Sequence, residues 1–179
     1  DDTNRPERAN PKRKKVLIFS PHPDDDVISM GGTFQRLVDQ GHDVHVVYQT
    51  SGNIAVSNDS VLKFLEVYKD ICEGKEDKIK KTINLLIDNN DIIEDRSVRD
   101  IAGKIREKEA LAATRYVGLD DSKVHFLKLP FYETGRIKKN KPKKNDDNLM
   151  IDIISKIKPH QIYAAGDLAD PHGTHAVCI

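Results

Sequence analysis

Short apolar runs alternate along the chain with longer segments in which apolar residues recur every three or four positions. The short runs are rich in β-branched residues and are bounded by charged residues, proline or glycine, which is typical of buried strands. They predict strands over residues 14–20, 42–50, 123–130 and 161–166. The segments with helical spacing predict helices over residues 27–40, 59–71, 79–88, 97–116 and 149–158.

Strands that alternate with helices indicate an α/β fold, here a three-layer α/β/α sandwich with a Rossmann-like, mostly parallel sheet. Residues 1–13 are polar, contain two prolines and show no periodicity, so we expect a linker or a disordered leader there. Residues 14–179 form the expected domain. Within it, the basic, turn-rich stretch 132–148 predicts a loop, and the mostly helical segment 57–96 is a candidate lid or partner surface.

The composition narrows the class of protein. The chain has 179 residues, a length that suits one domain, and 29 basic residues balance 29 acidic ones. A nucleic-acid-binding protein usually carries a basic excess, so we do not expect nucleic acid as a partner. No apolar run approaches the roughly 18 residues of a membrane span. The two cysteines, Cys72 and Cys178, do not make a disulfide framework, and a reducing, cytoplasmic setting is the expectation.

Two clusters of polar residues follow predicted strands. The sequence PHPDDD (21–26) follows the first strand, and the last strand is followed by Asp167, Asp170, His172 and His175. In open α/β sheets, ligands bind at the carboxyl ends of the strands. If the first and last strands are neighbours in the sheet, the two clusters meet in space despite their long separation in sequence.

The residue types in these clusters suit a divalent metal ion. Catalytic zinc takes three nitrogen or oxygen ligands from the protein and leaves a fourth position open. His22, one carboxylate of the aspartate run, and one or both of His172 and His175 can supply these ligands. Crowded carboxylates repel each other, and a cation among them removes that cost. The simpler interpretation of PHPDDD alone is a solvated acidic turn that caps the following helix.

A second H-x-x-H sequence, from His42 to His45, serves as an internal control. It lies in a predicted strand, where residues three apart point to opposite faces of the sheet. We therefore expect His42 and His45 to be ordinary strand and turn residues rather than joint ligands of one ion. His172 and His175 instead lie where a helix is expected to begin, and there the same spacing places both side chains on one face.

Several of these segments together resemble one family. PHPDDD resembles the A/P-H-P-D-D-E signature of the PIG-L/LmbE-like family of zinc-dependent N-deacetylases, and PHGTHAVC resembles the later H-x-x-H signature of that family. The segment IREKEALAATRYVGL is similar to the family's arginine-bearing helix, and KVHFLKLP is similar to the strand that follows it. The resemblance covers about residues 14–179, with paired motifs in the family's order.

The resemblance implies a role for each matching residue. His22, Asp25 and His175 match the family's metal ligands, with Zn²⁺ as the expected ion and Fe²⁺ as an alternative. Asp24 matches its general base. His172 matches the histidine that stabilises the oxyanion or protonates the leaving amine. Arg106 matches an arginine that approaches the substrate. The implied reaction removes an N-acetyl group from an N-acetylglucosamine-type sugar or sugar conjugate.

Departures from the family pattern qualify this hypothesis. Asp26 stands where the family signature ends in glutamate, and this shorter side chain bears on how a neighbouring ligand is oriented. The chain stops four residues after His175, so we expect the domain to be truncated at its C-terminus. Similar domains resemble a fusion partner of glucosamine-6-phosphate deaminase-like proteins, so a fused or oligomeric partner domain is a further expectation. Arg106 also has a plainer interpretation, as a helix-surface residue paired with Glu107 or Glu109.

Other functions remain as alternatives. A non-haem Fe(II) oxygenase could use two histidines and one carboxylate, but such enzymes usually have a jelly-roll of antiparallel strands. A dinucleotide-binding domain lacks support because no G-x-G-x-x-G follows the first strand, and the aspartates would repel a pyrophosphate. An inactive or regulatory metal-binding domain of a larger amino-sugar enzyme is the main alternative to a deacetylase.

Overall fold

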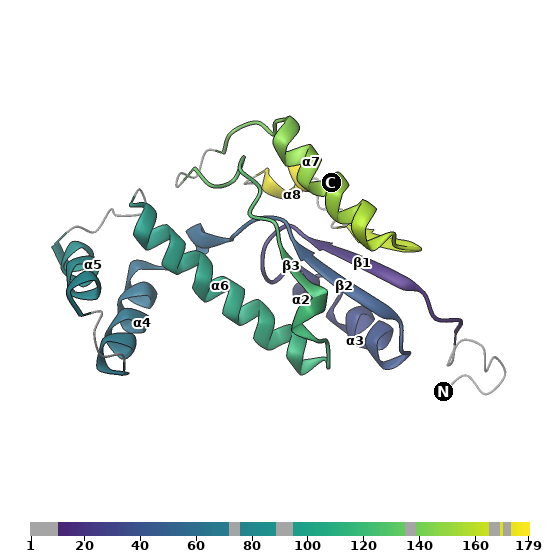
Figure 1. Cartoon of the computed structure of the whole chain (residues 1–179), viewed down its shortest axis with the longest axis horizontal. Coiled ribbons are helices and arrows are strands. Elements are labelled where there is room, and N and C mark those ends of the chain that lie inside the picture. The colour runs from purple at the N-terminus through teal and green to yellow at the C-terminus, as the bar shows by residue number, and fades with distance from the viewer. Residues whose placement is uncertain (1–10, 72–75, 89–94, 135–138, 165–168, 170–172) are drawn as a thin grey trace.

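The chain folds around a parallel sheet of four strands (Figure 1). The computed structural model describes residues 11–71, 76–88, 95–134, 139–164, 169 and 173–179. The strands are β1 (Lys15–Ser20), β2 (Asp43–Tyr48), β3 (Val124–Phe126) and β4 (Gln161–Ala164), and their order in the sheet is β3-β2-β1-β4. Every neighbouring pair is parallel, so the first and last strands lie side by side, as the two polar clusters require.

Helices connect these strands. Between β1 and β2 lie the short helix α2 (Asp25–Ile28) and α3 (Gly31–Asp39). Between β2 and β3 lie, in order, η1 (Asn53–Ala55), α4 (Asn58–Ile71), α5 (Glu76–Asp88), α6 (Arg96–Tyr116) and η3 (Asp121–Lys123). The last two helices are α7 (Lys144–Ile157), before β4, and α8 (Thr174–Cys178), after it.

The sheet separates two layers of helices, which confirms the predicted α/β/α sandwich. On one face, Val16, Ile18 and Val46 pack with Phe34 of α3 and Ala110 of α6. The opposite face packs against α7, and its core residues are Leu17, Phe19, Val47, Ile153 and Ile157. In Figure 1, α7 accordingly lies on one side of the strands, and α3 and α6 lie on the other. Alternate residues of β1 and β2 therefore point to opposite faces of the sheet and contribute to the core on each side.

Helices α4 and α5 extend from the sandwich on the N-terminal part of α6 (Figure 1). Together with α6 they form a separate core, made by Val61, Leu65, Ile79, Ile83, Leu86, Val98, Ala102 and Ile105. A second apolar row on α4 faces outward, because Phe64 is 55% exposed and Ile71 is 73% exposed. This part of the predicted segment 57–96 therefore has an apolar surface beyond its own core.

Three predicted boundaries were wrong. The helix expected over 27–40 is divided into α2 and α3 at Ser29 and Met30, so that α2 stays at the strand ends while Phe34 packs on the sheet. The strand expected over 123–130 ends at Phe126, because Lys128 adopts a positive φ of 50° and interrupts the regular ladder. The loop expected over 132–148 ends earlier than predicted, since α7 begins at Lys144.

The early start of α7 has a cause in tertiary structure. The carboxylate of Asp146, which is only 4% exposed, accepts hydrogen bonds from the backbone N–H of Lys143 (2.9 Å) and of Phe131 (2.9 Å). This caps the helix and ties it to the segment after β3. Of the expected leader, residues 1–13, the first ten residues lie outside the described part of the chain.

None of the helices in the described parts of the chain combines the length and the apolar character that crossing a bilayer requires.

Candidate metal site at the carboxyl ends of the strands

The turn after β1 presents two of the predicted metal ligands. The backbone N–H of His22 donates to Oδ2 of Asp25 at 2.8 Å, and the backbone N–H of Asp24 donates to the carbonyl of His22 at 2.8 Å. Below the turn, the Thr50 hydroxyl donates to the carbonyl of Pro21 at 2.7 Å and ties it to the end of β2. These bonds hold the side chains of His22 and Asp25 on the same side of the turn.

The third predicted ligand, His175, comes from α8. The preceding residue, Gly173, has a φ of 69°, a left-handed conformation that favours glycine and lets the chain turn into the helix. The side-chain amide of Gln49, next to the end of β2, donates to the carbonyl of Cys178 at 2.8 Å. The end of β2 therefore helps to hold α8 beside the turn that carries His22.

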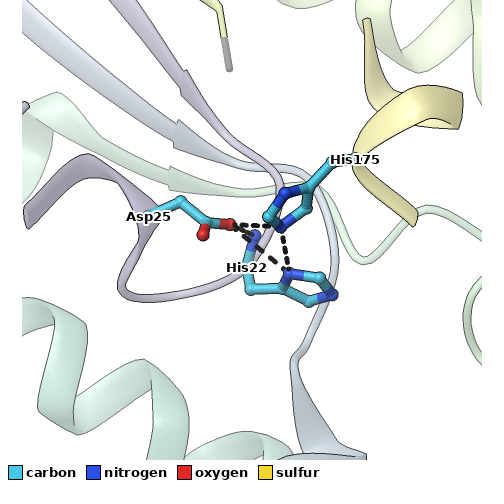
Figure 2. Close-up of side chains that lie close together, drawn as sticks. All are labelled: His22, Asp25 and His175. Carbon is cyan, nitrogen blue, oxygen red and sulfur yellow. Dashed lines mark hydrogen bonds and ion pairs between the residues drawn. The ribbon is translucent and has the colours of Figure 1, made fainter. Parts of the chain in front are cut away.

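Three donor atoms converge between these two segments (Figure 2). Nδ1 of His22 lies 3.1 Å from Nε2 of His175 and 3.4 Å from Oδ2 of Asp25, and that carboxylate oxygen lies 3.2 Å from His175 Nε2. Tetrahedral zinc with ligands at about 2.0–2.1 Å has neighbouring ligand atoms about 3.3 Å apart. Both the chemistry and the spacing of these donors therefore fit a small divalent cation with an open fourth position.

The environment of Asp25 favours its ionised form. Burial raises the pKa of this carboxyl, but hydrogen bonds from the ring and backbone of His22, together with the charge of His175, outweigh burial and lower the pKa below its ordinary value. Its side chain is 12% exposed. An ionised, partly buried carboxylate beside two imidazoles is suited to ligate a cation.

Asp24 is not one of the three converging residues, and its carboxylate instead meets Arg106 of α6. Nη2 of Arg106 donates to Oδ2 of Asp24 at 2.7 Å, while Nη1 donates to Glu109 at 2.9 Å. Burial acts to lower the pKa of Arg106, but the bonds to both carboxylates raise it overall. The side chain of Asp24 is 41% exposed, so it remains accessible to water. The ion pair with Glu109 agrees with the plainer interpretation of Arg106, while its expected approach to a substrate stays a prediction.

Close packing brings Arg106 to the turn. Gly52 precedes η1 with a φ of 62°, and a Cβ there would lie 2.7 Å from Cδ of Pro23 and 3.4 Å from Nε of Arg106. The ring of Tyr132 lies edge-on to that of His22, with 5.6 Å between the centroids. Glycine at position 52 thus allows three segments to meet beside the candidate metal site.

Asp26 lies under the turn instead of in the group of ligands. It is 2% exposed, and its carboxylate accepts a hydrogen bond from the Tyr48 hydroxyl at 2.9 Å, with the Ser20 hydroxyl 3.3 Å away. Burial raises the pKa of Asp26. The three consecutive aspartates therefore occupy three different environments, although the charge of Asp24 still acts to raise the pKa of Asp26.

The remaining candidates fall into two sets. His172, Asp167 and Asp170 lie outside the described residues. Nδ1 of His42 accepts a hydrogen bond from the backbone N–H of Lys14 at 3.0 Å, whereas His45 stacks on a histidine of β3, His125. His42 and His45 thus have separate partners, in agreement with their assignment as ordinary strand and turn residues.

Two parts of the site were not predicted. Ser20 and Tyr48, which contact Asp26, are the last residues of β1 and β2 and are paired in register. A polar residue at the end of each of two neighbouring parallel strands is a signal that could have identified them. Next to the site, the side-chain amide of Asn53 donates to Glu133 at 3.1 Å. No feature of the sequence connects these two residues.

Comparison with known proteins adds three similarities in sequence. The family described as PIG-L, GlcNAc-PI de-N-acetylase, matches residues 17–179. A glucosamine-6-phosphate deaminase-like protein of Bacteroides thetaiotaomicron is 50% identical over 189 residues, which cover 99% of this chain and 28% of that protein. The diacetylchitobiose deacetylase of Thermococcus kodakarensis is 44% identical over 48 residues, which cover 27% of this chain and 18% of that protein.

The fold is similar to a solved structure. This is the N,N'-diacetylchitobiose deacetylase from Pyrococcus horikoshii in complex with its inhibitor MPG, with a TM-score of 0.58 and 24% sequence identity. The match covers 97% of this chain and 48% of the solved chain. The chain thus spans about half of that structure and 28% of the Bacteroides protein.

Proposed function

The chain belongs to the PIG-L family of GlcNAc-PI de-N-acetylases, and from this premise we propose that it is a metal-dependent hydrolase that removes an N-acetyl group from an N-acetylglucosamine-type sugar or sugar conjugate. The observation that carries the proposal is the convergence of His22, Asp25 and His175, whose ligand atoms all lie within 4.8 Å of one another. Membership of the family supports N-deacetylation. The donor set supports a divalent cation.

His22, Asp25 and His175 would hold the cation. Two imidazoles and one carboxylate match the ligand types of catalytic zinc, so Zn²⁺ is the proposed ion and Fe²⁺ the alternative. When bound, such an ion supplies Lewis acidity toward an amide carbonyl and an attacking water. The protein contributes the geometry of the ligands and a site that is open on one side, since the three side chains are 12–21% exposed.

Asp24 is the proposed general base. It takes a proton from water as the water oxygen attacks the amide carbon. The carbon–nitrogen bond then breaks, His172 donates a proton to the departing amine, and acetate and a free amino sugar are the products. The position of Asp24 supports this role, because its carboxylate lies next to the ligand turn, is not one of the three converging donors, and is open to solvent.

Arg106 is proposed to approach the substrate from α6. Its guanidinium already holds one oxygen of Asp24, so it also orients the base. Only 16% of the side chain is exposed, so this partly buried arginine can donate to a sugar oxygen with little further loss of water.

An acetylated amino sugar is the proposed class of substrate. The family description names a de-N-acetylase of GlcNAc-PI, and two similar proteins are named diacetylchitobiose deacetylases. The Bacteroides relative is named for glucosamine-6-phosphate, which is also an amino sugar. These names share the glucosamine unit, so the proposal extends to this unit and not to what it is attached to.

A second candidate function is a metal-binding domain that acts only as part of a larger amino-sugar enzyme. It is favoured by the Bacteroides relative, of which this chain covers 28%. This alternative shares the metal site and differs in predicting no acetate release by the chain alone.

The test compares acetate release with metal content. The chain is stripped with a chelator, reloaded with Zn²⁺ or Fe²⁺, and incubated with N-acetylglucosamine or N,N'-diacetylchitobiose, while acetate and free amine are both measured. We expect equal amounts of the two products, lost on chelation and restored by the metal. Full activity of the stripped chain would contradict the proposal, and metal binding without acetate release would favour the second candidate.

A further inference from the structure

A buried hydrogen-bond network lies directly beneath the turn that carries the proposed ligands. Asp26 is its centre, and its partners are the residues that end β1 and β2. Both Ser20 and Tyr48 are 0% exposed, and the Tyr48 hydroxyl donates to Oδ2 of Asp26 at 2.9 Å. The network therefore joins the rigid sheet to the residue that follows Asp25.

The hydroxyl of Ser20 forms its hydrogen bonds mainly with backbone groups of the turn. It accepts from the N–H of Asp26 at 3.0 Å and lies 2.6 Å from the carbonyl of His22, to which it donates. A serine has a single proton to donate, so the shorter of its two bonds takes it, and the 3.3 Å approach to the Asp26 carboxylate is the weaker one. The Tyr48 hydroxyl is thus the main side-chain donor to this carboxylate among the described residues.

The other two aspartates of the turn are held by α6 and by the turn itself, since Asp24 accepts from Arg106 and Asp25 accepts from the backbone N–H of His22. Helix α2 has four residues, and Asp24, at its N-cap, makes no side-chain cap hydrogen bond. The helix carries Asp25 and Asp26 in one turn, so a rotation that frees Asp26 also turns the carboxylate of Asp25 away from the two histidines. Loss of an outer partner that orients a ligand commonly lowers metal affinity by about 10- to 100-fold.

We propose that Tyr48 is a positioning residue of the metal site, which acts through its hydrogen bond to Asp26 to hold the turn that carries Asp24 and Asp25. This inference rests on the proposed function, since it assumes that His22, Asp25 and His175 bind a metal. The ring of Tyr48 has a separate task, because it stacks on Phe126 with 5.1 Å between the centroids and belongs to the sheet core. Ring and hydroxyl can therefore be tested separately.

Tyr48→Phe removes the hydroxyl and keeps the ring. We expect the affinity for Zn²⁺, measured by competition with a chelating dye, to fall by about tenfold or more. The visible spectrum of the Co²⁺-loaded chain should also change, because it reports the arrangement of the ligands. A purely structural role would lower the melting temperature and leave the Co²⁺ spectrum as it is in the parent chain.

A double-mutant cycle tests the route through Asp26. If Tyr48 acts through that residue, Tyr48→Phe costs no further metal affinity in the Asp26→Asn background. The matched control is Tyr163→Phe on β4, which also removes a hydrogen-bonded hydroxyl, because Gln161 donates to it at 2.9 Å. We expect parental affinity and spectrum for this variant.

The outcomes separate this inference from the proposed function. Parental affinity and spectrum in Tyr48→Phe, with metal bound normally by the parent, would overturn the role of Tyr48 alone, as would independent losses that multiply in the double variant. If the parent chain itself binds no metal, the metal site and the inference both fall. If Asp26→Asn does not fold, the Co²⁺ spectrum of Tyr48→Phe alone tests whether Tyr48 positions the ligands.

Discussion

Two pairs of histidines lie equally close together in this fold. Nδ1 of His22 is 3.1 Å from Nε2 of His175, and Nδ1 of His45 is 3.1 Å from Nε2 of His125. The first pair joins the turn after β1 to α8, and the second joins β2 to β3. Distance between imidazoles therefore does not distinguish a candidate metal site from two packed side chains.

The neighbouring aspartates make the difference. Asp25 presents one oxygen to both histidines of its pair, at 3.4 Å and 3.2 Å. Asp43 instead lies 3.4 Å from Nε2 of His45, while His125 meets the opposite nitrogen of the same ring. Asp43 also pairs with Lys123 at 2.6 Å. A metal site needs donors that converge on one point, and only the first cluster meets that condition among the described residues.

Removing one histidine from each pair is the strongest test of this comparison. His175→Ala should abolish acetate release and weaken Zn²⁺ binding by more than about 100-fold, because loss of an outer partner alone costs about 10- to 100-fold. His125→Ala should leave zinc affinity unchanged. Metal titration of both variants checks this, and equal losses would show that the two pairs do not differ.

The two aspartates provide the next test. Asp24→Asn keeps the three converging donors and removes the proposed base, so we expect normal metal content and a turnover reduced by about 10²- to 10⁴-fold. Asp43→Asn, beside the other histidine pair, should keep both metal content and turnover. Full activity of Asp24→Asn in steady-state assays would show that another group accepts the proton.

Glycines near and far from the first cluster sharpen the comparison further. Gly52→Ala places a Cβ 2.7 Å from Pro23 at a positive φ, so we expect a loss of about 1–3 kcal/mol in the free energy of unfolding and a lower turnover. Gly32→Ala on α3 meets nothing within 4 Å and should stabilise the chain by about 0.5–1 kcal/mol. Urea unfolding measures both, and a stable, fully active Gly52→Ala would disprove the close packing at this position.

The smallest effect is expected from the second histidine pair. Burial lowers the pKa of His45 and His125 from 6.5, helped by Lys123 and, for His125, by Lys156, while Asp43 acts in the opposite direction on His45. The unfolded chain therefore binds more protons than the folded chain just below pH 6.5. Stability should be fully present above that pH and fall as the pH drops toward the lower folded values.

Thermal melts between pH 7.5 and 5 check this dependence, and His125→Asn should flatten it. These melts are made without metal, so that proton binding at the first cluster is the same in both proteins. An unchanged slope in His125→Asn would mean that the pair carries no part of the pH dependence.

The sequence predictions were accurate where an element is determined by its own residues, and inaccurate where it depends on contacts with distant ones. The strand β1 was found because its apolar, β-branched run is buried along almost its whole length. The start of α7 was missed because it depends on Asp146, whose carboxylate reaches the backbone of Phe131. The division between α2 and α3 was missed since Ile28 continues the apolar spacing although it is 75% exposed.

The candidate site, too, was predicted where its cause is local in the sequence and missed where its cause is a tertiary contact. Its location followed from the strand ends, and the structure brings His22, Asp25 and His175 together as expected. The roles assigned to Asp24, Arg106 and these three residues remain predictions. The hydrogen bond from Tyr48 to Asp26 could not be predicted from the sequence. A tyrosine in a buried strand usually packs in the core, and the partner of its hydroxyl depends on where the turn lies.

The two histidines of the first cluster are 153 positions apart in the chain. An ion that they share would close a loop of that length and remove conformational entropy from the unfolded chain worth roughly 5 kcal/mol, as a crosslink of that span does. During synthesis, β1 emerges long before α8, so the three proposed ligands can come together only after α8 has left the ribosome. Metal uptake would then follow the docking of α8 beside the turn after β1, and the loaded chain should outlast the empty one most clearly in resistance to unfolding and proteolysis.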